Sequence, residues 1–532
     1  MLIAVNLFMR TVGVSFNVYL SNRAGGEVMG LFSLLSGVYG LALTLGCAGI
    51  NLGTTRLVAE AMGESDDGSH GGLLSEEARR VVAGCLRRCI AYSLCCGVGA
   101  GVLLYLFSPV IGRVWLGDDR TVTSLRVLAL TLPPIALSSC MSGYFTAVRR
   151  ITPNAAVGIV AQFARIGFCA YLLTLWLPDG VEATCLALVL GGALAEMVNF
   201  LLTWGVYVLD KKRHLRVRCI AEENGDPYPS PTKRLLGITV PVTLSACLRS
   251  GLITLQHILI PRGLKQSGAS WKAALASYGV VHGMVLPVVL FPSAFISSFS
   301  GLLVPEIAES NARGDYARIA RISTRIITPA LVFSFGVAGI MMCFAHELGL
   351  TIYDSAEAGR YIRQLAPLIP IMYVDSSVDA VLKGMGEQVY SMNVNILDAL
   401  CSVILVWLLL PRIGLAGYIV AIYVTETLNT TLSLTRMLRV SGMKIQLWKQ
   451  VFGPLCCVTG ATCLVRLLGT RWPISAVHTK GGLATHILLT AVIYLLLLVL
   501  THVLGHEEAA TLRCLLPSLP RGEEKRKHPS HS

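Results

Sequence analysis

Two arginines, Arg10 and Arg249, stand inside long apolar runs, where a charged side chain needs a specific reason to be. The first run is NLFMRTVGVSFNVYLSNRAGG (residues 6–26) and the second is SACLRSGLITLQHILIPRG (residues 245–263). A charge placed at the centre of a bilayer costs roughly 3 kcal/mol or more, so such a residue usually faces a water-filled cavity or a partner. The two positions therefore predict a membrane protein with a basic internal cavity.

A second set of candidates consists of oxygen-bearing side chains in apolar runs of the second half: Asp375, Asp379, Asp398, Glu426, Asn429 and Thr430. Asp375 and Asp379 are four residues apart, which puts them on one face of a helix. Hard cations such as Na⁺ bind several oxygens, and a proton binds a carboxylate of raised pKa. We predict a site that couples to Na⁺ or H⁺. Ordinary hydrogen bonding between helices is the alternative.

The composition is that of a membrane protein. The 532 residues are 54% hydrophobic and 14% charged, with a mean hydropathy of +0.65, whereas soluble chains are about a quarter charged. The 44 Lys and Arg are spread over short loops, which argues against nucleic acid as a partner. The 16 cysteines include no CxxC pair, so we expect neither a metal site nor a cofactor. No basic segment precedes the first apolar run, so no cleavable signal peptide is predicted.

Fourteen apolar runs are long enough to cross a bilayer as helices. Their approximate limits are 2–21, 29–52, 86–107, 124–147, 154–177, 183–208, 236–260, 276–303, 322–345, 364–384, 390–410, 413–435, 450–469 and 483–504. We therefore predict an all-α polytopic membrane protein with about 14 transmembrane helices.

The basic residues predict the orientation in the membrane. With the N-terminus in the cytoplasm, 28 Lys and Arg fall on the cytoplasmic side and 13 on the outer side, while Arg10, Arg165 and Arg249 lie within spans. Cytoplasmic loops carry the excess of positive charge, so we expect both termini to be cytoplasmic.

The longest polar connection divides twelve of the spans into two sets of six. The expected units are a six-helix lobe (1–209), a cytoplasmic linker (210–234), a second six-helix lobe (235–440), helices 13 and 14 (441–505) and a cytoplasmic tail (506–532). Polar landmarks recur in the same order in both lobes. They are Arg10 with Arg23 and Arg249 with Arg262, Glu60 and Glu309, and Glu196-x-x-Asn199 and Glu426-x-x-Asn429. Duplicated transporters place the substrate between their halves.

Several stretches together carry a family resemblance. They are residues 276–310 with Tyr278-Gly279, Gly283-Met284, Pro287, Pro292 and Val304-Pro305-Glu306-Ile307; Arg10-x-x-Gly13; residues 146–165 with Pro153, Gln162 and Arg165; and LKGMGEQ at 382–388. These features resemble the stage V sporulation protein B group of the multidrug/oligosaccharidyl-lipid/polysaccharide exporter superfamily. The resemblance implies an alternating-access flippase for a polyprenyl-pyrophosphate-linked saccharide, either a peptidoglycan precursor or a polysaccharide unit, in a bacterial cell membrane. It also points to spore cortex synthesis as a setting.

The resemblance gives the predicted cavity a ligand. Guanidinium groups bind pyrophosphate oxygens in planar, bidentate form, so Arg10 and Arg249 are the first candidates for binding the headgroup. Arg56, Arg165 and His282 are further candidates. Arg56 alternatively marks a helix end, Arg165 holds helices together within one lobe, and His282 is a core residue. Lipid II flippases tend to carry an Arg-Asp pair where this chain has Phe16-Asn17, which implies a less basic cavity.

Two other functions stay open. One is a cation-coupled exporter of small molecules from the same superfamily, which would favour an acidic, aromatic cavity rather than Arg10 and Arg249. The other is a polytopic membrane enzyme. The loops are short and contain no HExxH or nucleophile-elbow pattern, so we expect no enzyme. The expected partners are the lipid bilayer and the polyprenyl-linked saccharide, and the expected state is a monomer.

Overall fold

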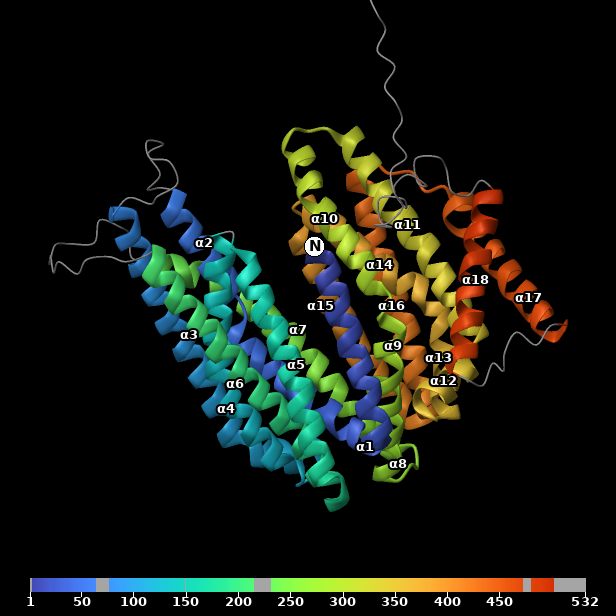
Figure 1. Ribbon diagram of the computed structural model, residues 1–532, viewed down its shortest axis with the longest axis horizontal. Coiled ribbons are helices and arrows are strands. Elements are labelled where there is room, and N and C mark those ends of the chain that lie inside the picture. Colours follow the sequence, from blue (N-terminus) through green and yellow to red (C-terminus); the bar gives the residue numbers. More distant parts are fainter. Residues whose placement is uncertain (1, 64–75, 149, 215–230, 472–479, 502–532) are drawn as a thin grey trace, which may run out of the picture.

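Figure 1 shows the computed structural model, which describes residues 2–63, 76–148, 150–214, 231–471 and 480–501. Every regular element in these ranges is a helix. Most of the predicted linker and the whole predicted tail lie outside the described residues.

The first half of the chain forms α1 (Leu2–Cys47), α2 (Ile50–Gly63), α3 (Glu76–Val110), η1 (Ile111–Leu116), α4 (Thr121–Ala147), α5 (Ile151–Trp176), η2 (Leu177–Asp179) and α6 (Val181–His214). The second half forms α7 (Pro231–Gln266), α8 (Trp271–Gly279), η3 (Val280–Val285), α9 (Leu286–Leu290), α10 (Ser293–Ala312), α11 (Tyr316–Cys343), α12 (Ala345–Tyr353), α13 (Ala356–Leu365), η4 (Ala366–Leu368), α14 (Ile369–Gly384), α15 (Gln388–Ile413) and α16 (Leu415–Ser441). The last helical elements are η5 (Trp448–Phe452), α17 (Gly453–Arg471) and α18 (Lys480–Leu500).

The prediction of an all-α polytopic membrane protein is confirmed. The described residues contain 12 helical segments that are long and apolar enough to cross a membrane. The first, Leu7–Met62, has 56 residues; its length of about 84 Å is more than two bilayer cores, so it holds the first two predicted spans. The predicted span 413–435 is α16, whose polar residues keep it out of that count. The helix number thus agrees with the predicted 14.

A glycine replaces the loop expected between the first two spans. The chain is helical on both sides of Gly25, which has a non-helical backbone conformation (φ 78°, ψ 171°) and forms a kink between the two helical parts of α1. This φ lies in the left-handed region that favours glycine. A Cβ at Gly25 would meet no atom within 4 Å, so the backbone conformation rather than packing requires glycine.

The predicted span 276–303 is a broken helix. It is divided into α8, the π-helical turn η3, α9 and α10. Pro287 and Pro292 lack an N–H and cannot complete the regular hydrogen-bond ladder, and π-turns commonly mark such irregular points. His282 lies on the π-turn, away from regular α geometry.

The helices form two groups that converge at one end of the molecule. In Figure 1, α2–α6 lie on one side and α10–α18 on the other, and the first half of α1 runs between them. The groups come together around α8 and the bend of α1, and they diverge toward the end that carries the N-terminus. We call the end at which the two groups come together the α8 end. The exact residue limits of the two lobes stay a prediction.

At the α8 end, α1 and α8 are in backbone contact. A Cβ at Gly30 would lie 2.1 Å from the carbonyl oxygen of Leu275, and a Cβ at Gly279 would lie 2.1 Å from that of Gly26. Neither position can carry a larger side chain without separating the helices. Small residues permit such close crossings of helices in membranes, so these two glycines fix the distance between the first half of the chain and the second.

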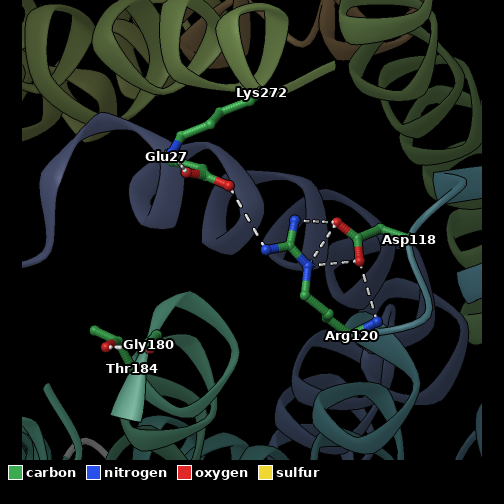
Figure 2. A network of polar contacts seen from close by, with 6 residues as sticks. All are labelled: Glu27, Asp118, Arg120, Gly180, Thr184 and Lys272. Atoms are coloured by element: carbon green, nitrogen blue, oxygen red, sulfur yellow. Dashed lines mark hydrogen bonds and ion pairs between the residues drawn. The ribbon is translucent and has the colours of Figure 1, made fainter. Parts of the chain in front are cut away.

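An ion-pair network ties the two halves together at the same end (Figure 2). The Glu27 carboxylate lies 3.6 Å from Arg120 and 3.5 Å from Lys272, which is in the first turn of α8. Arg120 in turn donates to Asp118 at 2.6 Å. Glu27 is therefore shared by one cation from each half of the chain.

Two further contacts join the halves near this end. The amide of Asn22 donates to the carbonyl oxygen of Ile352 at 2.7 Å, and the guanidinium of Arg262 donates to the carbonyl oxygen of Val114. Arg262, which the sequence marks as the companion of Arg249, thus contacts the backbone of the other half.

The Asp118–Arg120 pair predicts a pH-dependent stability. Burial raises the pKa of the Asp118 carboxyl, but the hydrogen bonds and charge of Arg120 outweigh burial and hold this pKa below its usual value. The folded state then binds this proton less readily than the unfolded state. The stabilisation is full above the usual aspartate range and is lost as pH falls through the lowered pKa.

We expect Asp118→Asn to lower the free energy of unfolding by about 2 kcal/mol at neutral pH. The difference from the unmodified protein should vanish well below about pH 4, where both carry a neutral group. Thermal unfolding across pH measures it. Asp119→Asn is the control, since the Arg113–Asp119 pair is 68% and 74% exposed and contributes little. If the loss of stability in Asp118→Asn does not depend on pH, the ionised Asp118 carboxylate is not the source of the stabilisation.

Candidate functional site

Arg10 lies on the first half of α1, which runs between the two groups of helices. Its side chain is exposed, and no acidic partner within 4.0 Å is found for it among the described residues. It lies close enough to Tyr373 of α14 to interact with it electrostatically. A cation in this position is available to an anionic ligand.

Arg249 approaches the same helix from α7. Its side chain is also exposed and lacks an ion-pair partner within the described ranges. It interacts electrostatically with Asp375 of α14 and with Asp398 of α15. Tyr373 and Asp375 are two residues apart, so both predicted arginines act on one turn of α14.

Three of the predicted acidic residues form an electrostatic cluster. Asp375, Asp398 and Glu426 interact with one another across α14, α15 and α16. The buried Oδ1 atoms of Asp375 and Asp398 have no hydrogen-bond partner among the described residues, and the same holds for the Oδ1 of Asn429 on α16. A buried acceptor without a partner costs about 1–3 kcal/mol, so these oxygens call for a function.

The other two predicted coupling residues have partners. The Ser391 hydroxyl donates to Asp379 at 2.5 Å, and the ammonium of Lys383 lies 3.8 Å away. Thr430 donates to the carbonyl oxygen of Ile371 at 3.4 Å. No three His, Cys, Asp or Glu side chains in the described residues lie close enough together to hold a metal ion. The acidic residues share charge without forming a metal cage.

Arg165 and Arg56 both have carboxylate partners. Arg165 of α5 pairs with Glu196 of α6 at 2.5 Å, which corresponds to the alternative that it holds helices of one lobe together. Arg56 pairs with Glu60 at 2.9 Å, one turn along α2, where both are exposed. A ligand role for either arginine stays a prediction.

His282 is enclosed by aromatic rings. Its Nε2 hydrogen-bonds with the hydroxyl of Tyr418, and its ring lies 4.8 Å from that of His257 and 4.7 Å from that of Tyr278. Tyr278 bonds with the Nδ1 of His257. This arrangement accounts for His282 as a core residue, and contact with substrate stays a prediction.

The repeated glutamates have diverged in their surroundings. Glu196 is paired with Arg165, whereas its counterpart Glu426 has no ion-pair partner among the described residues and lies near Asp375 and Asp398. The repeat in the sequence therefore does not give the two positions the same role.

Two cavities were not expected from the sequence. One, of about 350 Å³, lies between α1, α4, α5 and α6, and Asn17, Gln162, Arg165 and Glu196 are among its lining residues. The other, of about 190 Å³, lies between α10, α11 and α18 and is lined by apolar residues such as Phe299 and Phe333. The polar residues Asn17 and Gln162 within apolar runs were the available signal for the first.

The fold and the site define a polytopic transporter with a basic site between two groups of helices. Residues 1–264 match the family described as polysaccharide biosynthesis protein, and residues 271–408 match the MatE family. The chain is 24% identical to stage V sporulation protein B of Bacillus subtilis over 513 residues, which cover 95% of each protein.

Two solved structures share the fold. The lipid II flippase MurJ in an inward closed conformation aligns with a TM-score of 0.67 at 12% identity and covers 97% of this chain and 99% of that one. An inward-facing multidrug resistance MATE family transporter aligns with a TM-score of 0.55 at 16% identity, over 83% of this chain and 100% of that one. The chain belongs to the multidrug/oligosaccharidyl-lipid/polysaccharide exporter superfamily, in its polysaccharide biosynthesis family.

The pairing of Arg165 with Glu196 predicts that the loss of the arginine alone destabilises the protein more than the loss of both residues. Arg165→Met leaves a carboxylate without its cation, so we expect a loss of about 2 kcal/mol in the free energy of unfolding, and a smaller loss in Arg165→Met/Glu196→Met. Denaturation in detergent measures both variants. Arg56→Met serves as the control at an exposed pair. Equal losses in the single and double variants would refute a structural pair.

Proposed function

We propose that this protein moves a polyprenyl-pyrophosphate-linked saccharide from the inner to the outer leaflet of a bacterial cell membrane. The observation that carries the proposal is that Arg10 and Arg249, from different halves of the chain, act on one turn of α14 and lack carboxylate partners among the described residues. Two guanidinium groups match the several anionic oxygens of a pyrophosphate.

The second cavity supports a lipid substrate. Its walls on α10, α11 and α18 are almost entirely apolar, so an isoprenoid chain can pack against them by dispersion contacts. A polyprenyl chain fits such a surface. The names of the relatives, a sporulation protein and a lipid II flippase, are in keeping with this class of substrate.

The proposed orientation places the α8 end outside the cell. The positive-inside distribution puts both termini in the cytoplasm, so the backbone contact of Gly30 and Gly279 and the pairs of Glu27 close the protein toward the outer side. Release outside requires these contacts to open. The ion pairs of Glu27 with Lys272 and Arg120 are long, at 3.5 and 3.6 Å. Such contacts suit a closure that must break in every transport cycle.

Substrate and coupling ion meet electrostatically at Arg249. This residue acts on Asp375 and Asp398, and its positive charge favours their ionised form. An anion bound to Arg249 reduces that effect and so favours uptake of H⁺ or Na⁺ by the acidic cluster. By linkage, ion uptake then strengthens binding of the anion.

A small-molecule exporter is the second candidate, supported by the MatE match over residues 271–408. Exporters of cationic compounds need negative charge in the cavity. The free arginines Arg10 and Arg249 oppose that charge, so we favour the anionic lipid.

Removal of either free arginine should abolish transport. We expect Arg10→Ala and Arg249→Ala to lower the rate of flipping at least about 100-fold, since each charge-assisted contact to a desolvated anion contributes about 3 kcal/mol. Complementation of a flippase-deficient strain at equal expression and flipping in proteoliposomes are the measurements. Arg113→Ala, at an exposed pair, should remain active. Full activity of both Arg10→Ala and Arg249→Ala would refute the proposal.

The acidic cluster should confer the ion response. In proteoliposomes, imposing a proton or Na⁺ gradient should change the rate of flipping by the unmodified protein. Asp398→Asn should lose this response while still binding the substrate, because it removes one ionisable member of the cluster. Thr427→Val, an exposed position on α16, is the control. If the Asp398→Asn variant still responds to both ions, the acidic cluster is not the site of ion coupling.

A further inference from the structure

We propose that the cavity between α1, α4, α5 and α6 binds the sugar ring attached to the pyrophosphate. This inference rests on the proposed function and adds a saccharide subsite to it. The cavity of about 350 Å³ falls in the range of small-ligand pockets.

The first observation is its position relative to Arg10. Arg10, Gly13 and Asn17 follow one another at helical spacing on α1, and Gly13 and Asn17 line the cavity. Asn17 lies about 10 Å along the helix axis from Arg10. A sugar linked to a pyrophosphate at Arg10 therefore reaches the cavity without a change in the protein.

The second observation is a set of side chains with free hydrogen-bonding capacity. Gln162 lines the cavity and has no hydrogen-bond partner among the described residues. The Oδ1 of Asn17 accepts from Ser21 at 3.4 Å, which leaves its two N–H donors for a ligand. Carboxamides both donate and accept, as the hydroxyl groups of a sugar also do.

The remaining wall fits a neutral, amphipathic ring. Arg165 and Glu196 neutralise each other at 2.5 Å, so the cavity offers polar atoms without net charge. Phe16 and Phe32 supply apolar surface, on which the C–H face of a pyranose can pack.

Other ligands match this cavity less well. A cationic compound would meet a carboxylate already paired with an arginine. A polyprenyl chain would leave the amides of Asn17 and Gln162 without partners, at a cost, and has the apolar cavity of α10, α11 and α18 instead. A polyhydroxylated ring satisfies the amides and the aromatic surface together.

The test compares probes with and without a sugar on the full-length protein in nanodiscs. Farnesyl pyrophosphate is the sugar-free probe, and farnesyl pyrophosphate carrying glucose or N-acetylglucosamine supplies the sugar. For the unmodified protein we expect at least one sugar probe to bind about tenfold more tightly than the sugar-free probe, as measured by calorimetry.

Gln162→Leu and Asn17→Leu should lose this sugar-dependent gain while keeping the affinity for farnesyl pyrophosphate, which also shows that they are folded. Asn199→Leu, an amide on α6 outside the cavity lining, should keep the gain. Arg10→Ala should weaken binding of every probe.

The other outcomes separate the two proposals. If the sugar-free probe binds through Arg10 but no sugar adds affinity, or if both leucine variants keep the gain, the saccharide subsite is wrong and the pyrophosphate site stands. If both leucine variants also lose the sugar-free probe, the cavity is not a separate subsite. If no probe binds the unmodified protein, the proposed function and the subsite both fail.

Discussion

The cost of holding charge inside a membrane governs the arrangement of this protein. Each charged side chain in an apolar helix has to find a partner, water or a ligand. Arg165 meets this requirement with Glu196 inside one group of helices. Among the described residues, Arg10 and Arg249 have no such ion-pair partner: Arg10 interacts electrostatically with Tyr373, and Arg249 with Asp375 and Asp398. That difference is our reason for proposing a ligand role for Arg10 and Arg249 and a structural role for Arg165, although all three look alike in the sequence.

The same cost explains how opposite charges in the second half work together. Asp375, Asp398 and Glu426 interact unfavourably with one another, and Arg249 offsets the charge of Asp375 and Asp398. A group that both stabilises the carboxylates and attracts the substrate cannot do the two things independently. In the proposed mechanism, binding of an anion at Arg249 would therefore change the affinity of the acidic cluster for an ion without a conformational signal between remote sites.

Hydropathy and charge were sufficient to predict the helices, because a bilayer requires about 20 apolar residues per crossing and satisfied backbone groups throughout. They were insufficient wherever the backbone departs from a straight helix. The sequence shows Gly25 only as one of several glycines near a turn, and its φ of 78° is a property of the folded chain. Likewise, periodicity treats residues 276–303 as one span, whereas two prolines divide it and place His282 on a π-turn beside Tyr418.

The sequence could not predict which charged side chains of the site form ion pairs, because the partners lie far apart in the chain. The predicted repeat aligns Glu196 with Glu426, but only the fold shows that Glu196 has an arginine beside it. The consequence extends to the cavity in the first half. Because Arg165 and Glu196 neutralise each other there, we propose that this cavity recognises its ligand through the uncharged Asn17 and Gln162. Discrimination there follows from hydrogen bonds that a wrong ligand leaves unmade, whereas attraction at Arg10 follows from charge that any pyrophosphate carries. In this proposal, affinity depends on Arg10 of α1, and selectivity depends on Asn17, about two turns further along α1, and on Gln162 of α5. Either property can then change by substitution without loss of the other.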